Sequence, residues 1–153
     1  MAAPFLNLVV LRAPDIEEAQ RFYSLLGLSF TKHAHGSGPQ HYAAESGSQV
    51  FEIYPQTTAE DSTRSVRIGF KVISLDTTVA RLAEGGAKVI TAPKESPWGR
   101  RAVISDPFGH KIELIEDAVV HPKPPNKAPE PTPGPVTPPA EPGVAPAPSV
   151  AHL

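Results

Sequence analysis

The sequence DPFGHKIELIE (residues 106–116) predicts a tight turn that leads into a β-strand. Its Pro107 and Gly109 stand where a type I turn followed by a bulge favours proline and glycine. Apolar residues then alternate with Lys111 and Glu113, as in a strand that buries one face. Burial of a carboxylate among such neighbours is unfavourable unless its charge is compensated. We therefore expect Glu113 to face a cavity rather than a packed core.

Glu113 has a counterpart 61 residues earlier, Glu52, in the similar apolar run QVFEIY. The elements before each glutamate follow the same order. In the first copy, a capping box at Asp15 and Glu18 starts a helix that ends at Gly27. Turns rich in Gly, Pro and Ser separate the strands, which are expected at residues 6–12, 28–34, 40–45 and 49–54.

The second copy begins with a strand and a helix that follows Ser74. Two tandem βαβββ modules, at about residues 5–55 and 65–117, predict an α+β fold. They should form a curved, partly open mixed β-sheet around a concave cleft, with the helices on the outer face. The strands of the second copy are expected at residues 65–73, 87–92, 100–105 and 110–116.

The composition excludes several classes of protein. The chain of 153 residues has no cysteine, which excludes disulfides and thiolate metal sites. A formal net charge of -2 gives no reason to expect nucleic acid as a partner. The apolar run at the N-terminus is too short to span a bilayer, and Arg12 interrupts it. We expect a soluble, cytoplasmic protein without a membrane partner.

Proline marks the end of the folded domain, which is expected to cover residues 1–118. Of the 19 prolines, 12 lie between Pro122 and Pro148. Residues 119–153 have too few large apolar side chains to offset the entropy of ordering, so a disordered tail is expected. The alternative is that its PxxP spacings bind a protein partner.

Four segments resemble the vicinal oxygen chelate superfamily, which includes glyoxalase I, extradiol dioxygenases and bleomycin-resistance proteins. They are LVVLRAPDIEEAQRFYSLLGLSF (8–30), FEIY (51–54), SPWGRR (96–101) and DPFGHKIELIE (106–116). The resemblance covers roughly residues 5–117 and implies the tandem βαβββ fold. It also implies that the partner is a small organic molecule. The resemblance does not indicate which reaction or binding activity the chain has, because the superfamily hosts several chemistries.

The resemblance also implies where a metal would bind. Metal-using members have four ligand positions, one on the first and one on the last strand of each module. The last-strand positions here are Glu52 and Glu113, which match. The first-strand positions are Leu8 and Arg67, and neither is a usual ligand. We therefore expect no cofactor and no metal centre of the usual kind.

Arg67 suggests a replacement for the ion. We expect its guanidinium to lie between Glu52 and Glu113, which would leave about one net negative charge for a cationic or hydrogen-bond-donating ligand. The alternative is an ion cluster with a purely structural role. The main hypothesis is thus a metal-free protein that binds a small organic molecule in its cleft.

His41 supports a second hypothesis, a divalent-metal-dependent lyase, isomerase or dioxygenase. A two-residue turn at residues 46–47 would place His41 directly across from Glu52. His41, Glu52 and Glu113 would then be the metal ligands, or His41 and Glu52 an acid/base pair. The alternative is a histidine that only bonds its neighbour. His33 and His35 share one face, two residues apart, a spacing that also suits metal ligands; we expect both, and His110, to be solvated instead.

Three further residues are expected at the cleft. Tyr54 shares the face of Glu52, and one of Arg100 and Arg101 should point inward, with Arg101 as the candidate. Trp98 is either a lid that stacks on a planar ligand or a plug for one end of the sheet. A homodimer is expected, because a domain this small has a limited core of its own.

Overall fold

The computed structural model describes residues 2–117, and the tail predicted for residues 119–153 lies outside this part. The first module begins where Asp15 caps α1: its carboxylate accepts a hydrogen bond of 2.9 Å from the Glu18 N–H. Gly27 follows the helix with a φ of 93°, a conformation that favours glycine. The module comprises β1 (Leu8–Ala13), α1 (Ile16–Ser24), β2 (Phe30–His33), β3 (His41–Ser46) and β4 (Gln49–Pro55).

The second module repeats this order and confirms the predicted α+β fold of tandem βαβββ modules. The strands form two open, four-stranded mixed sheets, with the orders β1-β4-β3-β2 and β5-β8-β7-β6. The first and last strands of each module are parallel neighbours. The elements are β5 (Arg67–Val72), α2 (Leu75–Glu84), β6 (Lys88–Lys94), β7 (Arg101–Ser105) and β8 (Lys111–Glu116).

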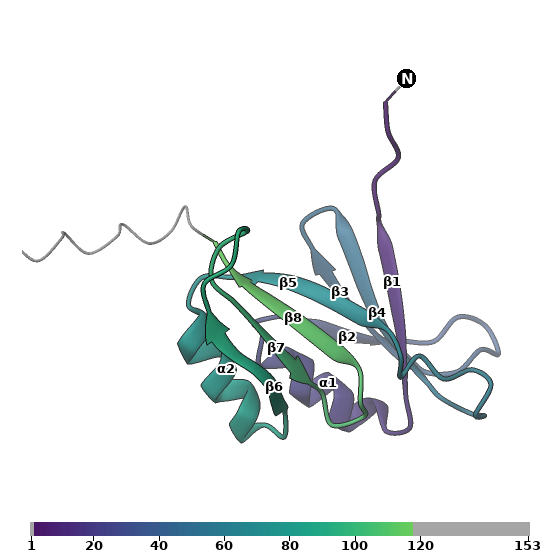
Figure 1. Ribbon diagram of the computed structural model, residues 1–153. Coiled ribbons are helices and arrows are strands. Elements are labelled where there is room, and N and C mark those ends of the chain that lie inside the picture. Colours follow the sequence, from purple (N-terminus) through teal and green to yellow (C-terminus); the bar gives the residue numbers. More distant parts are fainter. Residues whose placement is uncertain (1, 118–153) are drawn as a thin grey trace, which may run out of the picture. The chain divides into compact units, whose positions relative to one another are not determined.

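Each sheet buries one face against its own helix, as Figure 1 shows for α2 and the second sheet. Phe51 and Ile53 of β4 are buried, as are Ile112 and Leu114 of β8. The alternate residues point to the opposite faces, which the helices leave open. These open faces are where side chains can meet a ligand.

One continuous core joins the two modules. It contains buried residues of both helices and both sheets, among them Phe22, Leu82 and Leu114. The rings of Phe51 and Phe70 meet edge to face with centroids 5.9 Å apart, and so connect β4 with β5. None of the helices among the described residues is both long and apolar enough to cross a membrane.

Candidate functional site

The open face of the second sheet carries a cationic pocket of about 710 Å³. β5 and β8 are neighbours with Gly69 opposite Glu113, so Arg67 lies one diagonal step from the carboxylate. Since Gly69 has no side chain, the Arg67 guanidinium can reach across to Glu113. The pocket is lined by Arg67, Lys71, Trp98, Arg101, Glu113 and Ile115.

Two guanidiniums hold the same carboxylate oxygen in this pocket. Arg67 Nη2 donates to Glu113 Oε2 over 2.5 Å, and Arg101 Nη2 donates to the same atom over 3.2 Å. The three cations Arg67, Lys71 and Arg101 face one carboxylate, so three positive charges and one negative leave +2. The Nε atom of Arg101 is buried and has no hydrogen-bond partner among the described residues.

The predicted triad of Glu52, Arg67 and Glu113 is not formed within the chain. Glu52 lies on the first sheet, whereas Arg67 and Glu113 belong to the second sheet. Sequence alternation placed both acids on open faces, which is correct, but it carried no information on whether the two faces share one pocket. The pocket around Arg67 and Glu113 contains Arg101 and not Glu52. Its net charge is therefore positive, whereas the sequence predicted about one net negative charge.

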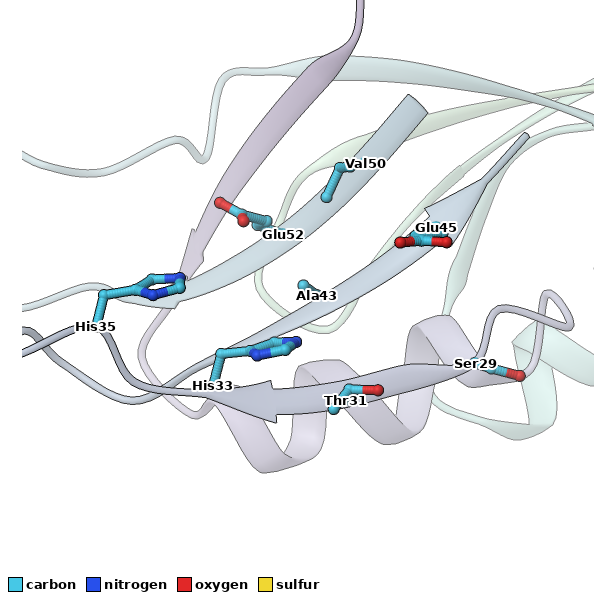
Figure 2. Close-up of a pocket in the computed structure, with 8 residues that line it drawn as sticks. All are labelled: Ser29, Thr31, His33, His35, Ala43, Glu45, Val50 and Glu52. Atoms are coloured by element: carbon cyan, nitrogen blue, oxygen red, sulfur yellow. The ribbon is translucent and has the colours of Figure 1, made fainter. Parts of the chain in front are cut away.

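Glu52 lines a different pocket of about 580 Å³ on the first sheet. Figure 2 shows the Glu52 carboxylate and the rings of His33 and His35 on the same side of the strands. The acids of this pocket are Glu45 and Glu52. The full lining is Ser29, Thr31, His33, His35, Ala43, Glu45, Val50 and Glu52.

The expected pairing of His41 with Glu52 is wrong by one step of register. Ser46 pairs with Gln49, so the turn residues are Gly47 and Ser48, and Ala43 lies opposite Glu52. Gly47 has a φ of 63°, which suits the first position of a two-residue hairpin turn. His41 still lies on the same face as Glu52, but two residues further along the partner strand than expected. Its ring therefore stacks on Tyr54, with centroids 4.1 Å apart.

The residues present do not fit a metal centre of the usual family kind. The strand register confirms that Leu8 and Arg67 are equivalent: they oppose Val50 and Lys111, each two residues before a glutamate. Leu8 has no donor atom, and the Arg67 guanidinium already binds Glu113. Glu52 and Glu113 line different pockets, and no three His, Cys, Asp or Glu residues among residues 2–117 are grouped so that they could hold a metal ion.

The structure separates the two neighbouring arginines. Arg101 points into the cationic pocket, whereas Arg100 bonds Asp76 with distances of 2.8 and 3.2 Å. The hydrogen bond and charge of Arg100 lower the pKa of Asp76. Trp98 lines the pocket and is 74% exposed. So exposed a side chain does not fill one end of the sheet within residues 2–117, which argues against the interpretation of Trp98 as a plug.

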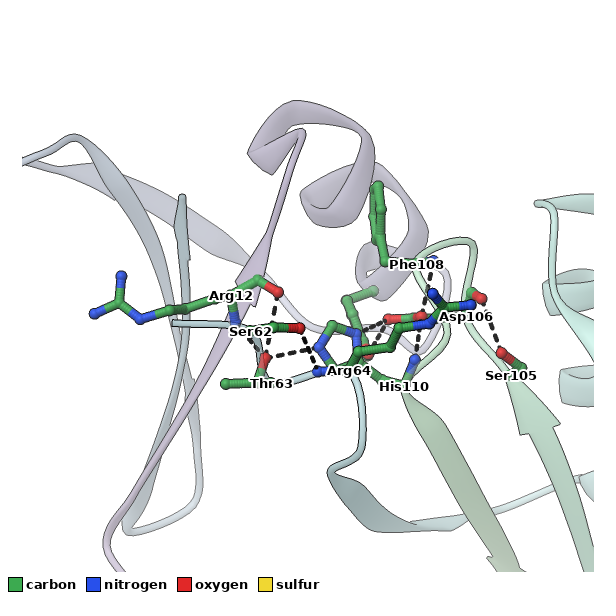
Figure 3. Close-up of polar contacts among 9 residues, drawn as sticks. Arg12, Ser62, Thr63, Arg64, Ser105, Asp106, Phe108 and His110 are labelled. Carbon is green, nitrogen blue, oxygen red and sulfur yellow. Dashed lines mark hydrogen bonds and ion pairs between the residues drawn. The ribbon is translucent and has the colours of Figure 1, made fainter. Parts of the chain in front are cut away.

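A second constellation, absent from the sequence-based predictions, joins the modules. Figure 3 shows Thr63, His110 and Asp106 in one chain of hydrogen bonds. His110 Nδ1 lies 2.7 Å from Asp106 Oδ2, and its Nε2 lies 2.8 Å from Thr63 Oγ1. Tyr23 of α1 donates to Asp106 Oδ2 over 2.8 Å, and the Arg12 N–H donates to Thr63 Oγ1 over 2.8 Å.

This arrangement has the order of a nucleophile, base and acid, but its burial assigns it a structural role. His110 and Asp106 are 2% and 4% exposed, so no substrate can reach the imidazole. The expectation of a solvated His110 is wrong, because the linker residue Thr63 and the turn residue Asp106 enclose it. Burial raises the pKa of Asp106, but hydrogen bonds from His110, Tyr23 and the backbone outweigh this effect and lower the pKa overall.

Comparisons with known proteins agree with this architecture. The family model of the Glyoxalase/Bleomycin resistance protein/Dioxygenase superfamily matches residues 5–114. An uncharacterized protein of Mycolicibacterium smegmatis is 28% identical over 106 residues, which are 69% of this chain and 88% of the relative.

Two solved structures illustrate the likeness of fold. TnmS3, an antibiotic binding protein from Streptomyces sp. CB03234, is 26% identical with a TM-score of 0.61, over 77% of this chain and 99% of that chain. A glyoxalase/bleomycin resistance protein/dioxygenase family enzyme from Burkholderia phytofirmans PsJN is 18% identical with a TM-score of 0.58, over 72% of this chain and 96% of that chain. The second similarity concerns the fold alone.

Replacement of Trp98 tests whether this side chain supports the fold. Because Trp98 is 74% exposed, Trp98→Ala should change the free energy of unfolding by less than about 0.5 kcal/mol. Leu114→Ala is the contrasting variant: this side chain is 0% exposed, and its loss should cost about 2–5 kcal/mol. Urea unfolding followed by circular dichroism measures both, and a large loss in Trp98→Ala would restore the plug interpretation.

The buried carboxylate makes a prediction about acid stability. Asp106→Asn should lower the free energy of unfolding by about 3 kcal/mol at pH 7, because it removes one partner of a buried pair. The pKa of Asp106 is lowered from 3.8, so its stabilisation is complete above that pH and is lost as pH falls through the folded-state pKa. The difference in free energy of unfolding between the wild type and Asp106→Asn should therefore decrease as the pH falls below 3.8.

Glu60→Gln is the matched control for the acid titration, since Glu60 is exposed. Its unfolding free energy should follow that of the wild type at every pH. A difference between Asp106→Asn and wild type that stays constant down to pH 2 would show that the charge of Asp106 does not contribute.

Proposed function

Because the chain belongs to the Glyoxalase/Bleomycin resistance protein/Dioxygenase superfamily, we propose that it binds a small, planar organic anion in the cationic pocket of its second sheet. The observation that carries this proposal is the pair of guanidiniums, Arg67 and Arg101, held at one wall of the pocket by Glu113. Binding needs neither a metal centre of the usual family kind nor another cofactor. The sequence had suggested a cationic or hydrogen-bond-donating ligand. We propose an anion instead, because the pocket has a formal charge of +2.

Glu113 orients the two guanidiniums rather than cancelling them. Each guanidinium has five N–H donors in a fixed plane, and the contacts to Glu113 use one nitrogen of each. The remaining donors of Arg67 and Arg101 suit a carboxylate or phosphate, which such forks bind in bidentate fashion.

The apolar part of the pocket supports a planar ligand. Trp98 presents an exposed indole ring at its wall, and Ile115 adds an apolar surface. Exposure of so large an apolar side chain is unfavourable in water, and a ring stacked on Trp98 would remove it from solvent. TnmS3 is an antibiotic binding protein, and a small organic ligand for the present chain is consistent with that likeness.

We propose further that two copies of the chain associate as a homodimer. Phe5, Leu6 and Leu8 are exposed to 73%, 63% and 44% beside the free edge of β1. The two pockets also have complementary charges: Glu45 and Glu52 give −2 on the first sheet, against +2 on the second. A second copy that packs its first module on the second module of its partner would bring these charges together.

Fluorescence titration tests the ligand class. Trp98 is the only tryptophan, so quenching reports on this pocket alone. The planar anion 2-naphthoate should quench it in a saturable manner, whereas the cation 2-naphthylmethylammonium should not. Arg67→Ala and Arg101→Ala should each weaken naphthoate binding at least tenfold, because a hydrogen bond to a charged group contributes about 1.5–3 kcal/mol.

Arg100→Ala is the matched control, since this arginine bonds Asp76 outside the pocket. It should bind naphthoate like the wild type. Preference for the cation, or equal loss in all three arginine variants, would contradict the proposed role of Arg67 and Arg101.

Sedimentation velocity tests the dimer. The wild-type chain should sediment with twice the monomer mass, and Leu8→Asp should shift it to the monomer, because a carboxylate would be buried beside β1. Val89→Asp on β6 is the control, as Val89 is 41% exposed and pairs with the buried Ile104, which places it on the helix-covered face of the second sheet rather than on the open face. A monomeric wild type at micromolar concentration would refute the proposed association.

A further inference from the structure

Three histidine rings gather on the open face of the first sheet, outside the cationic pocket. His33 pairs directly with His41 across β2 and β3, and His35 follows His33 on the same side of the chain. The ring centroids are 6.2 Å apart for His33 and His35, 5.9 Å for His33 and His41, and 5.1 Å for His35 and His41. The sequence suggested solvated side chains for His33 and His35, with metal ligation as the alternative, but it did not predict that His41 lies beside them.

His41 is an unusual member, because it is 1% exposed and its Nε2 atom has no hydrogen-bond partner within residues 2–117. Its Nδ1 lies 3.3 Å from the carbonyl oxygen of Pro39. A carbonyl can only accept, so this contact places the proton on Nδ1 and leaves the lone pair of Nε2 free. An imidazole whose other nitrogen donates to a backbone carbonyl is the usual form of a metal-binding histidine.

The ring spacing is close to that of three imidazoles around one ion. Zinc–nitrogen bonds are about 2.0–2.1 Å long, which in a tetrahedral site places the ring centroids about 5 Å apart. As the side chains stand, no three His, Cys, Asp or Glu residues among residues 2–117 converge on one point. His33 and His35 are exposed, however, so their rings can turn toward His41 without disturbing the core.

We propose that His33, His35 and His41 bind one divalent transition metal ion, with zinc as the best match to three imidazole ligands. Nearby carboxylates favour a cation, since Glu45 and Glu52 line the adjoining pocket. Three protein ligands leave one of the four positions of zinc open to water or a small ligand from that pocket. The site shares no residue with the cationic pocket, so it stands or falls independently of the proposed function.

Calorimetric titration of the full, untagged chain with Zn²⁺ tests this site. The wild type should bind one ion per chain. His33→Asn, His35→Asn and His41→Phe should each weaken binding by at least about 100-fold, since the loss of mere supporting residues costs about 10- to 100-fold. The first two positions are exposed, so those variants keep the fold, and phenylalanine keeps the stacking of residue 41 on Tyr54.

Two controls separate this site from incidental binding. Glu45→Gln removes a charge from the same pocket, and His121→Asn removes a histidine that lies outside the described residues. Both should still bind one ion, and X-ray absorption of the wild-type complex should show imidazole nitrogens at about 2.0–2.1 Å. A wild type that takes up no Zn²⁺, or unchanged binding in His35→Asn and His41→Phe, would overturn the proposal.

Discussion

The buried carboxylate of Asp106 is the interaction on which the arrangement of the two modules depends. It accepts hydrogen bonds from Tyr23 in the first module and from His110 in the second, while His110 contacts Thr63 in the connection between them. An ionised group with these partners is stable only while all of them remain in place. Because these bonds tie α1 of the first module to the turn before β8 of the second, separation of the modules would leave a buried carboxylate without partners.

The duplicated modules have diverged in chemistry while keeping their geometry. Leu8 and Arg67 occupy equivalent register positions, as do Glu52 and Glu113. In the second module the guanidinium at this position compensates the glutamate, and Arg101 adds a second positive charge. In the first module Leu8 has no charge to compensate Glu52, and the Glu52 carboxylate instead lines a pocket with His33 and His35. One fold thus presents an anionic and a cationic surface.

The sequence predicted local structure well and spatial convergence poorly. Alternation and turn chemistry were sufficient for all the helices and strands, because burial of one face determines period and ends locally. The position of His41 was missed because a hairpin register depends on which turn residue adopts a positive φ, and Gly47 takes the first position rather than the second. The burial of His110 depends on Thr63, 47 residues away, which no local pattern reveals.

The opposite charges of the two open faces would link the proposed ligand binding to the proposed self-association. A ligand anion in the cationic pocket would neutralise part of the +2 charge, which in the proposed dimer would also attract the acidic face of a second chain. If both use the same donors, ligand and partner compete; if the partner only closes the pocket, each strengthens the binding of the other. Reciprocity requires that either effect appear equally in ligand affinity and in dimer stability. Since Glu113 leaves most N–H donors of Arg67 and Arg101 free, the pocket can accommodate ligand oxygens without releasing Glu113, which favours the cooperative case.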